Sequence, residues 1–182
     1  MTDGLAMLAL RDDGAREQDG AMVAIVMGVT GAGKTTIGRA LAAALGWEFH
    51  DGDDLHSDAS KRKMQSGIAL DDADRAPWLS AIRKLTEAML SEDRNGVIAC
   101  SALKQSYRDE LVVDPKLVKV VYLKGSEHLI SERLRNRGGH FMNPALLQSQ
   151  FDTLEVPHDA IVVDVSAAPE ALVDAIKSRL GH

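Results

Sequence analysis

The first clear hydrophobic pattern along the chain is a continuous apolar run at residues 22–27, with the sequence MVAIVM. Such a run is typical of a strand buried on both faces of a parallel sheet, because no polar side chain alternates with the apolar ones. Further short runs predict four more strands, over residues 47–50, 97–100, 117–123 and 161–165. We therefore expect the five strands to form one buried sheet.

Apolar positions at helical spacing lie between the predicted strands. In the longest such segment, residues 76–91, Pro77 is expected in the first turn, where a missing N–H costs nothing. Ser57 is expected to cap a shorter helix, and Gly46 to end the helix that precedes it. The other helices are predicted over residues 34–45, 104–112, 127–137 and 169–180 and after Pro144. Strands that alternate with helices predict a single α/β domain over residues 22–182.

The first 21 residues differ in composition from this domain. Residues 1–20 contain five acids and two bases. Their net charge of −3 is half of the chain's formal net charge of −6. They lack the basic, apolar and small-residue order of a signal peptide. We expect residues 1–21 to be a flexible leader, or else the product of a start codon placed too early, with Met22 near the natural start.

Composition narrows the classes of partner and compartment. No apolar run approaches the ~18 residues that a membrane span needs, so we expect no membrane partner. The net charge of −6 gives no global basic footprint for nucleic acid. The lone cysteine, Cys100, cannot form an internal disulfide, which fits a reducing cytoplasm.

Residues 28–35, GVTGAGKT, fit the phosphate-binding pattern G-x-x-x-x-G-K-[ST]. The pattern has the required context, since a buried strand precedes it and an amphipathic helix follows it. The glycines let backbone N–H groups turn toward phosphate oxygens, Lys34 adds a charge on the β and γ phosphates, and Thr35 can ligate Mg²⁺. A glycine-rich turn without a ligand is the alternative. The predicted nucleotide-binding residues are Gly28, Val29, Thr30, Gly31, Ala32, Gly33, Lys34, Thr35 and Thr36.

An acidic pair follows the second predicted strand. Asp51 and Asp53 would face the same side of an extended chain, and the carboxyl ends of the strands are where open α/β sheets bind ligands. We expect Asp53 to accept the proton of an attacking hydroxyl and Asp51 to lie nearer the magnesium, while Asp54 faces away. The alternative is a solvated acidic turn that caps the helix at Ser57.

Three groups of basic residues could hold anions at the same edge. Arg75 stands at a predicted helix start, where a cation is unfavourable, so it should hold either a neighbouring Asp or a substrate carboxylate. Lys104 and Arg108 are four apart and would share a helix face, which is either a binding face or an exposed basic face. Basic residues also end the helix before Gly138 and Gly139. These residues either stabilise the C-terminus of that helix or belong to a lid near residues 133–143. In the lid, Arg133 and Arg137 would be the catalytic arginines.

Several segments together resemble the gluconokinase family of P-loop small-molecule kinases. They are MGVTGAGKTT, DGDDLH, KMQSG with LDDADRAPWL, CSALKQSYRDEL, VYLKG, and RLRNRGGHFM through LLQSQFDTLE. They run from about residue 25 to 156 in the family's order, and DGDDLH and CSALK..YRD discriminate best. Ala69 departs from the family, which usually has proline there.

The resemblance implies a three-layer P-loop kinase fold with strand order 2-3-1-4-5. It also implies a homodimer that uses ATP and Mg²⁺ to convert gluconate into 6-phosphogluconate. By position, the residues implied to meet the acceptor are Asp53, His56, Arg75, Lys104 and Arg108, with Asp51 beside them. A kinase for another small acid, such as shikimate, is the nearest alternative, although shikimate kinases lack the CSALK..YRD string. A non-catalytic nucleotide-binding switch is a second alternative.

Overall fold

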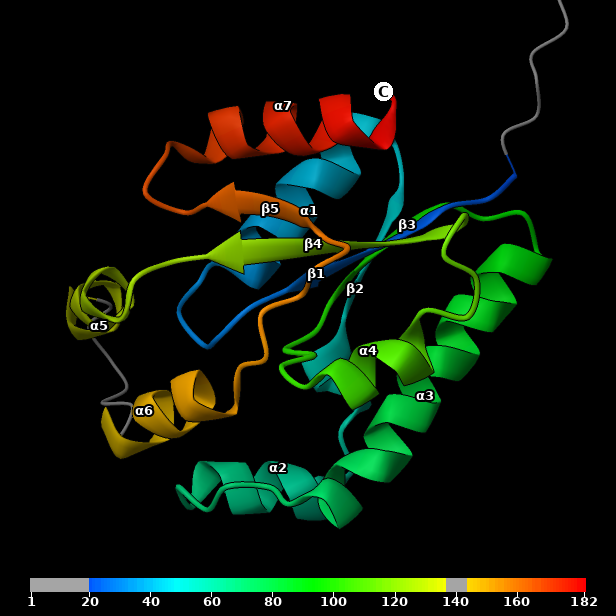
Figure 1. The fold of residues 1–182 in the computed structure, drawn as a ribbon. Helices are drawn as coiled ribbons and strands as arrows, with labels where there is room; N and C mark the ends of the chain where they lie inside the picture. Colours follow the sequence, from blue (N-terminus) through cyan, green and yellow to red (C-terminus); the bar gives the residue numbers. More distant parts are fainter. Residues whose placement is uncertain (1–19, 137–143) are drawn as a thin grey trace, which may run out of the picture.

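The computed structural model describes residues 20–136 and 144–182. Its centre is a five-stranded sheet in the order β2-β3-β1-β4-β5, and every neighbouring pair is parallel (Figure 1). This confirms the predicted fold class and strand order, and each strand end lies within one residue of the prediction. The strands are β1 Val23–Met27, β2 Glu48–Asp51, β3 Gly96–Ala99, β4 Val118–Lys124 and β5 Ile161–Asp164.

Helices cover both faces of the sheet and make three layers. α1 and α7 pack against one face together with each other, and α3 and α4 pack together over the opposite face (Figure 1). α5 and α6 lie beyond the carboxyl end of β4. The helices are α1 Lys34–Leu45, α2 Asp58–Gln65, α3 Asp72–Ser91, α4 Gln105–Leu111, α5 Glu127–Asn136, α6 Pro144–Thr153 and α7 Pro169–Leu180, and a 3₁₀ turn, η1, covers Gly52–Leu55.

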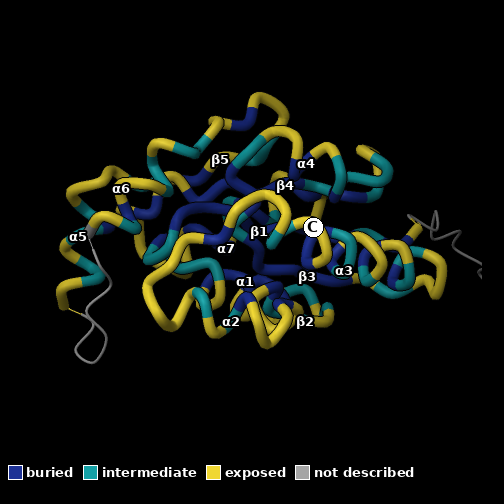
Figure 2. The backbone as a smooth tube through the Cα atoms, turned by 90° about the horizontal axis from the view of Figure 1, so that it is seen from below, coloured by how far each residue is buried: buried dark blue, intermediate teal, exposed yellow. Residues whose placement is uncertain are grey.

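The central strand β1 is buried on both sides. Ala24 and Val26 belong to the apolar cluster under α1 and α7, whereas Val23, Ile25 and Met27 belong to the cluster under α3. All five are at most 1% exposed. Figure 2 shows the same arrangement, with the buried strands inside and the exposed segments on the helices around them. The continuous apolar run therefore serves two cores, as the pattern predicts.

Helix α3 begins at Asp72, four residues before the predicted start, and this places Pro77 inside the helix. The prediction of a first-turn proline was therefore wrong. The cause is a capping box in the acidic string: Asp71 accepts from the Asp74 amide, and the Asp74 side chain accepts from the Asp71 amide. The predictions for Ser57 and Gly46 are confirmed, since Ser57 caps α2 and Gly46 ends α1 in the left-handed conformation.

Two predicted segments fall largely outside the described residues, namely leader residues 1–19 and lid residues 137–143. At the start of the described chain, Ala21 is 6% exposed and its amide donates to Asp93, while the Met22 amide donates to Asn95. In the described part of the chain, no helix combines the length and the apolarity needed to cross a membrane.

Candidate active site

The loop between β1 and α1 has the backbone of a phosphate cradle. Gly28, Gly31 and Gly33 all have positive φ, at 149°, 78° and 97°. At Gly31 even the space excludes a side chain, because a Cβ would lie 2.9 Å from Leu134. Lys34 begins α1 and its Nζ donates to the Val29 carbonyl at 3.1 Å, so the lysine arches back over the loop. The loop and the N-terminus of α1 can therefore hold an anion between them.

A hydroxyl and a carboxylate meet beside this loop. Thr35 Oγ1 donates to Asp51 Oδ2 at 2.9 Å, and Asp51 Oδ1 accepts from the Asp53 amide at 3.2 Å. Both are hard oxygen donors of the kind that Mg²⁺ prefers. Nowhere in residues 20–136 and 144–182 do three or more His, Cys, Asp or Glu side chains form a metal cluster. The donor set fits an ion that takes its other ligands from phosphates and water.

Asp53 reaches the acceptor side by a different route from the one expected. The chain after Asp51 is not extended but turns into η1, so the argument from strand alternation was wrong. The turn nevertheless places Asp53 in the wall of a pocket beside the phosphate loop. Asp54 does not line that pocket, and its carbonyl accepts from Lys61 Nζ at 3.0 Å.

This acceptor-side pocket has a volume of about 250 Å³. Its wall combines the phosphate loop and η1 with residues of α3, α4 and α6 that lie far apart in sequence. Its polar lining includes Lys34, Asp53, His56, Arg75, Tyr107 and Gln150. The pocket thus joins a phosphate site to a small, mixed-charge cavity, which is the arrangement needed to hold a phosphoryl donor and an acceptor together.

His56 is held in the pocket wall by Trp78. The two rings stack at 4.4 Å with an interplanar angle of 10°, and Trp78 Nε1 donates to the Gly52 carbonyl at 2.7 Å. His56 is 7% exposed, and burial lowers its pKa, although the nearby Asp53 charge opposes this. Among the described residues, the buried Nδ1 of His56 has no hydrogen-bond partner. A neutral imidazole with an unsatisfied polar atom suits a hydrogen bond to a ligand.

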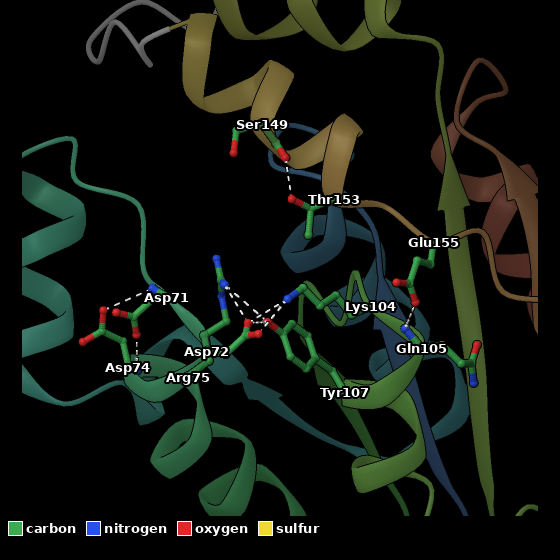
Figure 3. Close-up of polar contacts among 10 residues, drawn as sticks. All are labelled: Asp71, Asp72, Asp74, Arg75, Lys104, Gln105, Tyr107, Ser149, Thr153 and Glu155. Atoms are coloured by element: carbon green, nitrogen blue, oxygen red, sulfur yellow. Dashed lines mark hydrogen bonds and ion pairs between the residues drawn. The ribbon is translucent and has the colours of Figure 1, made fainter.

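A cluster of charged side chains stands at the edge of the pocket (Figure 3). Lys104 Nζ lies 2.8 Å from both carboxylate oxygens of Asp72, and the Tyr107 hydroxyl donates to Asp72 Oδ1. Arg75 Nη1 donates to the Tyr107 hydroxyl at 3.3 Å and lies 3.7 Å from Asp72 Oδ1. The Lys104 and Tyr107 hydrogen bonds lower the pKa of Asp72, so this carboxylate is charged near neutral pH. Arg75 faces both a neighbouring Asp and the pocket, and Lys104 is not in the pocket wall.

The prediction that Arg108 meets the acceptor is not supported. Arg108 is 3% exposed, and its guanidinium donates to the carbonyls of Ala102, Leu103 and Glu155. The shared-face argument was wrong because Lys104 precedes α4 as its N-cap instead of lying within the helix. Ala102 has a left-handed φ of 43°, so Arg108 braces an unusual turn after β3.

Arg133 lies on the other side of the phosphate loop from the acceptor pocket. Its Nη2 donates to the Val165 carbonyl at 2.5 Å. It lines a second hollow of about 380 Å³, between the loop, the end of α5 and the segment from β5 to α7. Such a hollow beside a phosphate cradle has room for a nucleobase. Arg137 lies outside the described residues, so the paired lid arginines stay a prediction.

Sequence reasoning missed Gln150, whose Oε1 accepts from the Thr30 amide at 2.7 Å. The two residues are 120 positions apart, and no local pattern signals the contact. It expected a neighbouring Asp beside Arg75 but missed the pairing of Asp72 with Lys104, and it gave Trp78 no role in the site. A role for Trp78 could have been inferred from its position one helical turn after Arg75 in the family-like segment LDDADRAPWL.

Comparisons with known proteins agree with this geometry. The family model described as shikimate kinase matches residues 30–177. A gluconokinase of Gluconobacter oxydans is 46% identical over 74% of this chain and 76% of its own length. A gluconokinase of Arabidopsis thaliana is 41% identical over 88% of this chain and 93% of its own length. The crystal structure of a gluconokinase from Sinorhizobium meliloti superposes with a TM-score of 0.80 at 42% identity, covering 89% of this chain and 92% of the other. The chain therefore belongs to the gluconokinase family of P-loop kinases, which is related to shikimate kinase.

Proposed function

We propose that this kinase transfers the γ-phosphoryl group of ATP to the primary hydroxyl of D-gluconate, giving 6-phosphogluconate and ADP. The observation that carries the proposal is the acceptor-side pocket, whose wall contains a carboxylate, Asp53, together with the phosphate-loop lysine and a cation, Arg75. A small acid with a hydroxyl to phosphorylate needs these three groups. The names of the similar gluconokinases support the same acceptor.

On the donor side, the phosphate loop binds the β and γ phosphates through backbone N–H groups, and Lys34 places its charge on them. Thr35 and Asp51 are the residues that would hold Mg²⁺, which supplies charge neutralisation on the phosphates when bound. The adenine is assigned to the hollow lined by Arg133. Arg133 and Arg137 are proposed to belong to a lid that closes when ATP binds.

On the acceptor side, Asp53 takes the proton of the attacking hydroxyl. The oxygen of that hydroxyl forms a bond to the γ-phosphorus while the bond to the bridging β–γ oxygen breaks, and ADP leaves with the electron pair. Arg75 binds the carboxylate of the sugar acid, and His56 and Tyr107 offer hydrogen bonds to its hydroxyls. Fixing both substrates in one pocket removes much of the entropic barrier to their reaction.

Coupled ADP release tests this function directly. We expect gluconate to accelerate ATP consumption strongly, and ³¹P NMR to show a phosphomonoester on its primary carbon. Shikimate is the control acceptor, because a shikimate kinase family model matches the chain. Faster turnover with shikimate than with gluconate would reassign the acceptor. ATP binding with no acceptor-dependent turnover would indicate a non-catalytic switch.

Two further properties are proposed, the first from the family resemblance and the second from the lone cysteine, which fits a reducing compartment. The first is a homodimer, which light scattering of the purified protein would detect as twice the chain mass of 19.6 kDa. The second is a cytoplasmic location, which fractionation of the source cells would test. Neither a nucleic-acid nor a membrane partner is proposed.

A further inference from the structure

The charged cluster at the pocket edge contains two cations, Lys104 and Arg75, and one carboxylate, Asp72, so it carries one positive charge in excess. Lys104 Nζ lies 2.8 Å from each carboxylate oxygen of Asp72, whereas Arg75 Nη1 lies 3.7 Å from Asp72 Oδ1. The Tyr107 hydroxyl lies between them, accepting from Arg75 and donating to Asp72. Lys104 and Asp72 therefore form a neutral pair, and Arg75 carries the cluster's one remaining positive charge.

Three other carboxylates on the flanks of this cluster are engaged elsewhere. Asp74 accepts from Lys63 Nζ at 2.6 and 2.8 Å, and Asp71 accepts from the Asp74 amide at the start of α3. Glu155 accepts from the Gln105 amide at 2.6 Å. Figure 3 shows these three groups on the flanks of the cluster, with Ser149 and Thr153 of α6 above it. Asp72 is thus the carboxylate that decides how many free cations the acceptor meets.

Lys104 is close enough to the pocket to bind the acceptor if it were released. Its Nζ lies 5.4 Å from the centre of the Tyr107 ring, and the Tyr107 side chain lines the pocket. A lysine side chain is flexible, and its ammonium group can swing through such a distance. What keeps Lys104 from the acceptor in this structure is its pairing with Asp72, which also raises the pKa of the lysine.

We infer that Asp72 sets the charge that the acceptor must carry. By neutralising Lys104 it leaves Arg75 as the free cation of this cluster, which stands apart from Lys34 on the phosphate loop. Among the described residues, the acceptor end of the site therefore favours a monoanionic carboxylate over a dianionic phosphate at the same end of the molecule. This inference rests on the proposed function, in which Arg75 binds the carboxylate of a sugar acid. Selectivity then comes from withholding a second cation as well as from offering the first.

The probe that separates the two charge states is sorbitol 1-phosphate. It has a chain of hydroxyls and a free primary hydroxyl like gluconate, but it ends in a phosphate dianion instead of a carboxylate. Asp72→Asn raises the number of free cations in the cluster to two. We expect its kcat/KM for sorbitol 1-phosphate, relative to that for gluconate, to rise about tenfold or more over wild type. Lys104→Met leaves Asp72 to neutralise Arg75, and its KM for gluconate should rise about tenfold.

The double variant Asp72→Asn/Lys104→Met distinguishes charge from simple disruption. It restores one free cation, so its preference for gluconate should return toward the wild-type value although two contacts have been removed. Glu87→Gln is the matched control, because it makes the same charge change in an exposed ion pair with Arg83 on the same helix. Glu87→Gln should leave kcat/KM for both acceptors unchanged.

The outcomes separate this inference from the proposed function. If the wild-type enzyme does not phosphorylate gluconate, the proposed function fails, whatever the variants do. If wild type is active but the double variant is worse than either single variant, Asp72 merely positions its neighbours and the inference is overturned. Should Asp72→Asn fail to fold, as circular dichroism would show, the comparison of Lys104→Met with the double variant still decides. A lower KM for gluconate in the double variant than in Lys104→Met supports the inference, and a higher KM contradicts it.

Discussion

The phosphate loop and the acceptor pocket lie side by side but are built in different ways. The loop is eight consecutive residues whose glycines have positive φ and whose binding groups belong mostly to the backbone. Beyond the loop residues Thr30 and Lys34, the acceptor pocket is lined by residues from η1, α2, α3, α4 and α6 and from the segments between them. A site built from backbone depends on a short motif, whereas a site built from side chains depends on the fold that gathers them. The two regions should therefore respond to mutation in different kinetic constants.

The largest effect is expected on the acceptor side, at the general base. Asp53→Asn keeps the size of the side chain but removes its basicity, so kcat should fall ~10²- to 10⁴-fold with little change in ATP binding. Steady-state kinetics with gluconate would measure this. Asp54→Asn is the control, since its side chain is not in the pocket wall, and it should be nearly silent. A larger loss in Asp54→Asn than in Asp53→Asn would move the base to the other carboxylate.

On the donor side, Lys34→Ala should lower kcat by ~10²-fold, the usual worth of a charge aimed at a transition state. Lys34 stands on the loop and not in either apolar cluster, so the fold should survive, as circular dichroism can check. Retention of more than about a tenth of the wild-type kcat would contradict the assigned role. Together with Asp53→Asn, this variant shows whether both regions act in the chemical step.

A smaller effect is expected where the two regions touch. Gln150→Ala removes the hydrogen bond between α6 and the Thr30 amide, which should loosen the phosphate loop. A neutral hydrogen bond is worth ~0.5–1.5 kcal/mol, so KM for ATP should rise roughly 2- to 10-fold. Gln148→Ala is a matched control, because Gln148 lies on the same helix and donates a hydrogen bond to Asp152 at the surface. Equal KM values in the two variants would show that the contact does not support the loop.

The two regions also differ in how far the sequence predicts them. The strands and the loop follow from contiguous patterns, whereas the strand order follows from the family resemblance, and all three are confirmed. The errors on the acceptor side come from assumptions about local backbone. The family resemblance implied that Arg108 meets the acceptor, and the expected helix face shared with Lys104 agreed with it, but Lys104 is the N-cap of α4. The direction of Asp53 was predicted from an extended chain, which is in fact a 3₁₀ turn.

Neutralisation of one charge by another is harder still to predict from sequence. Lys104 and Asp72 are 32 residues apart, and each looks available for binding when its own segment is considered alone. Only the packing of α3 against α4 brings them together. The number of free cations in the acceptor site is therefore a property of the fold and cannot be counted from the motifs.

The central claim is that the acceptor pocket recognises a carboxylate through Arg75, and the most direct test is the ratio of kcat/KM for gluconate to that for neutral glucose. Wild type should favour gluconate by about a hundredfold or more. Arg75→Gln should raise KM for gluconate roughly 10- to 100-fold, because a charged hydrogen bond contributes ~1.5–3 kcal/mol, and should leave KM for ATP nearly unchanged. Equal activity of the wild-type enzyme on glucose and gluconate would contradict the account.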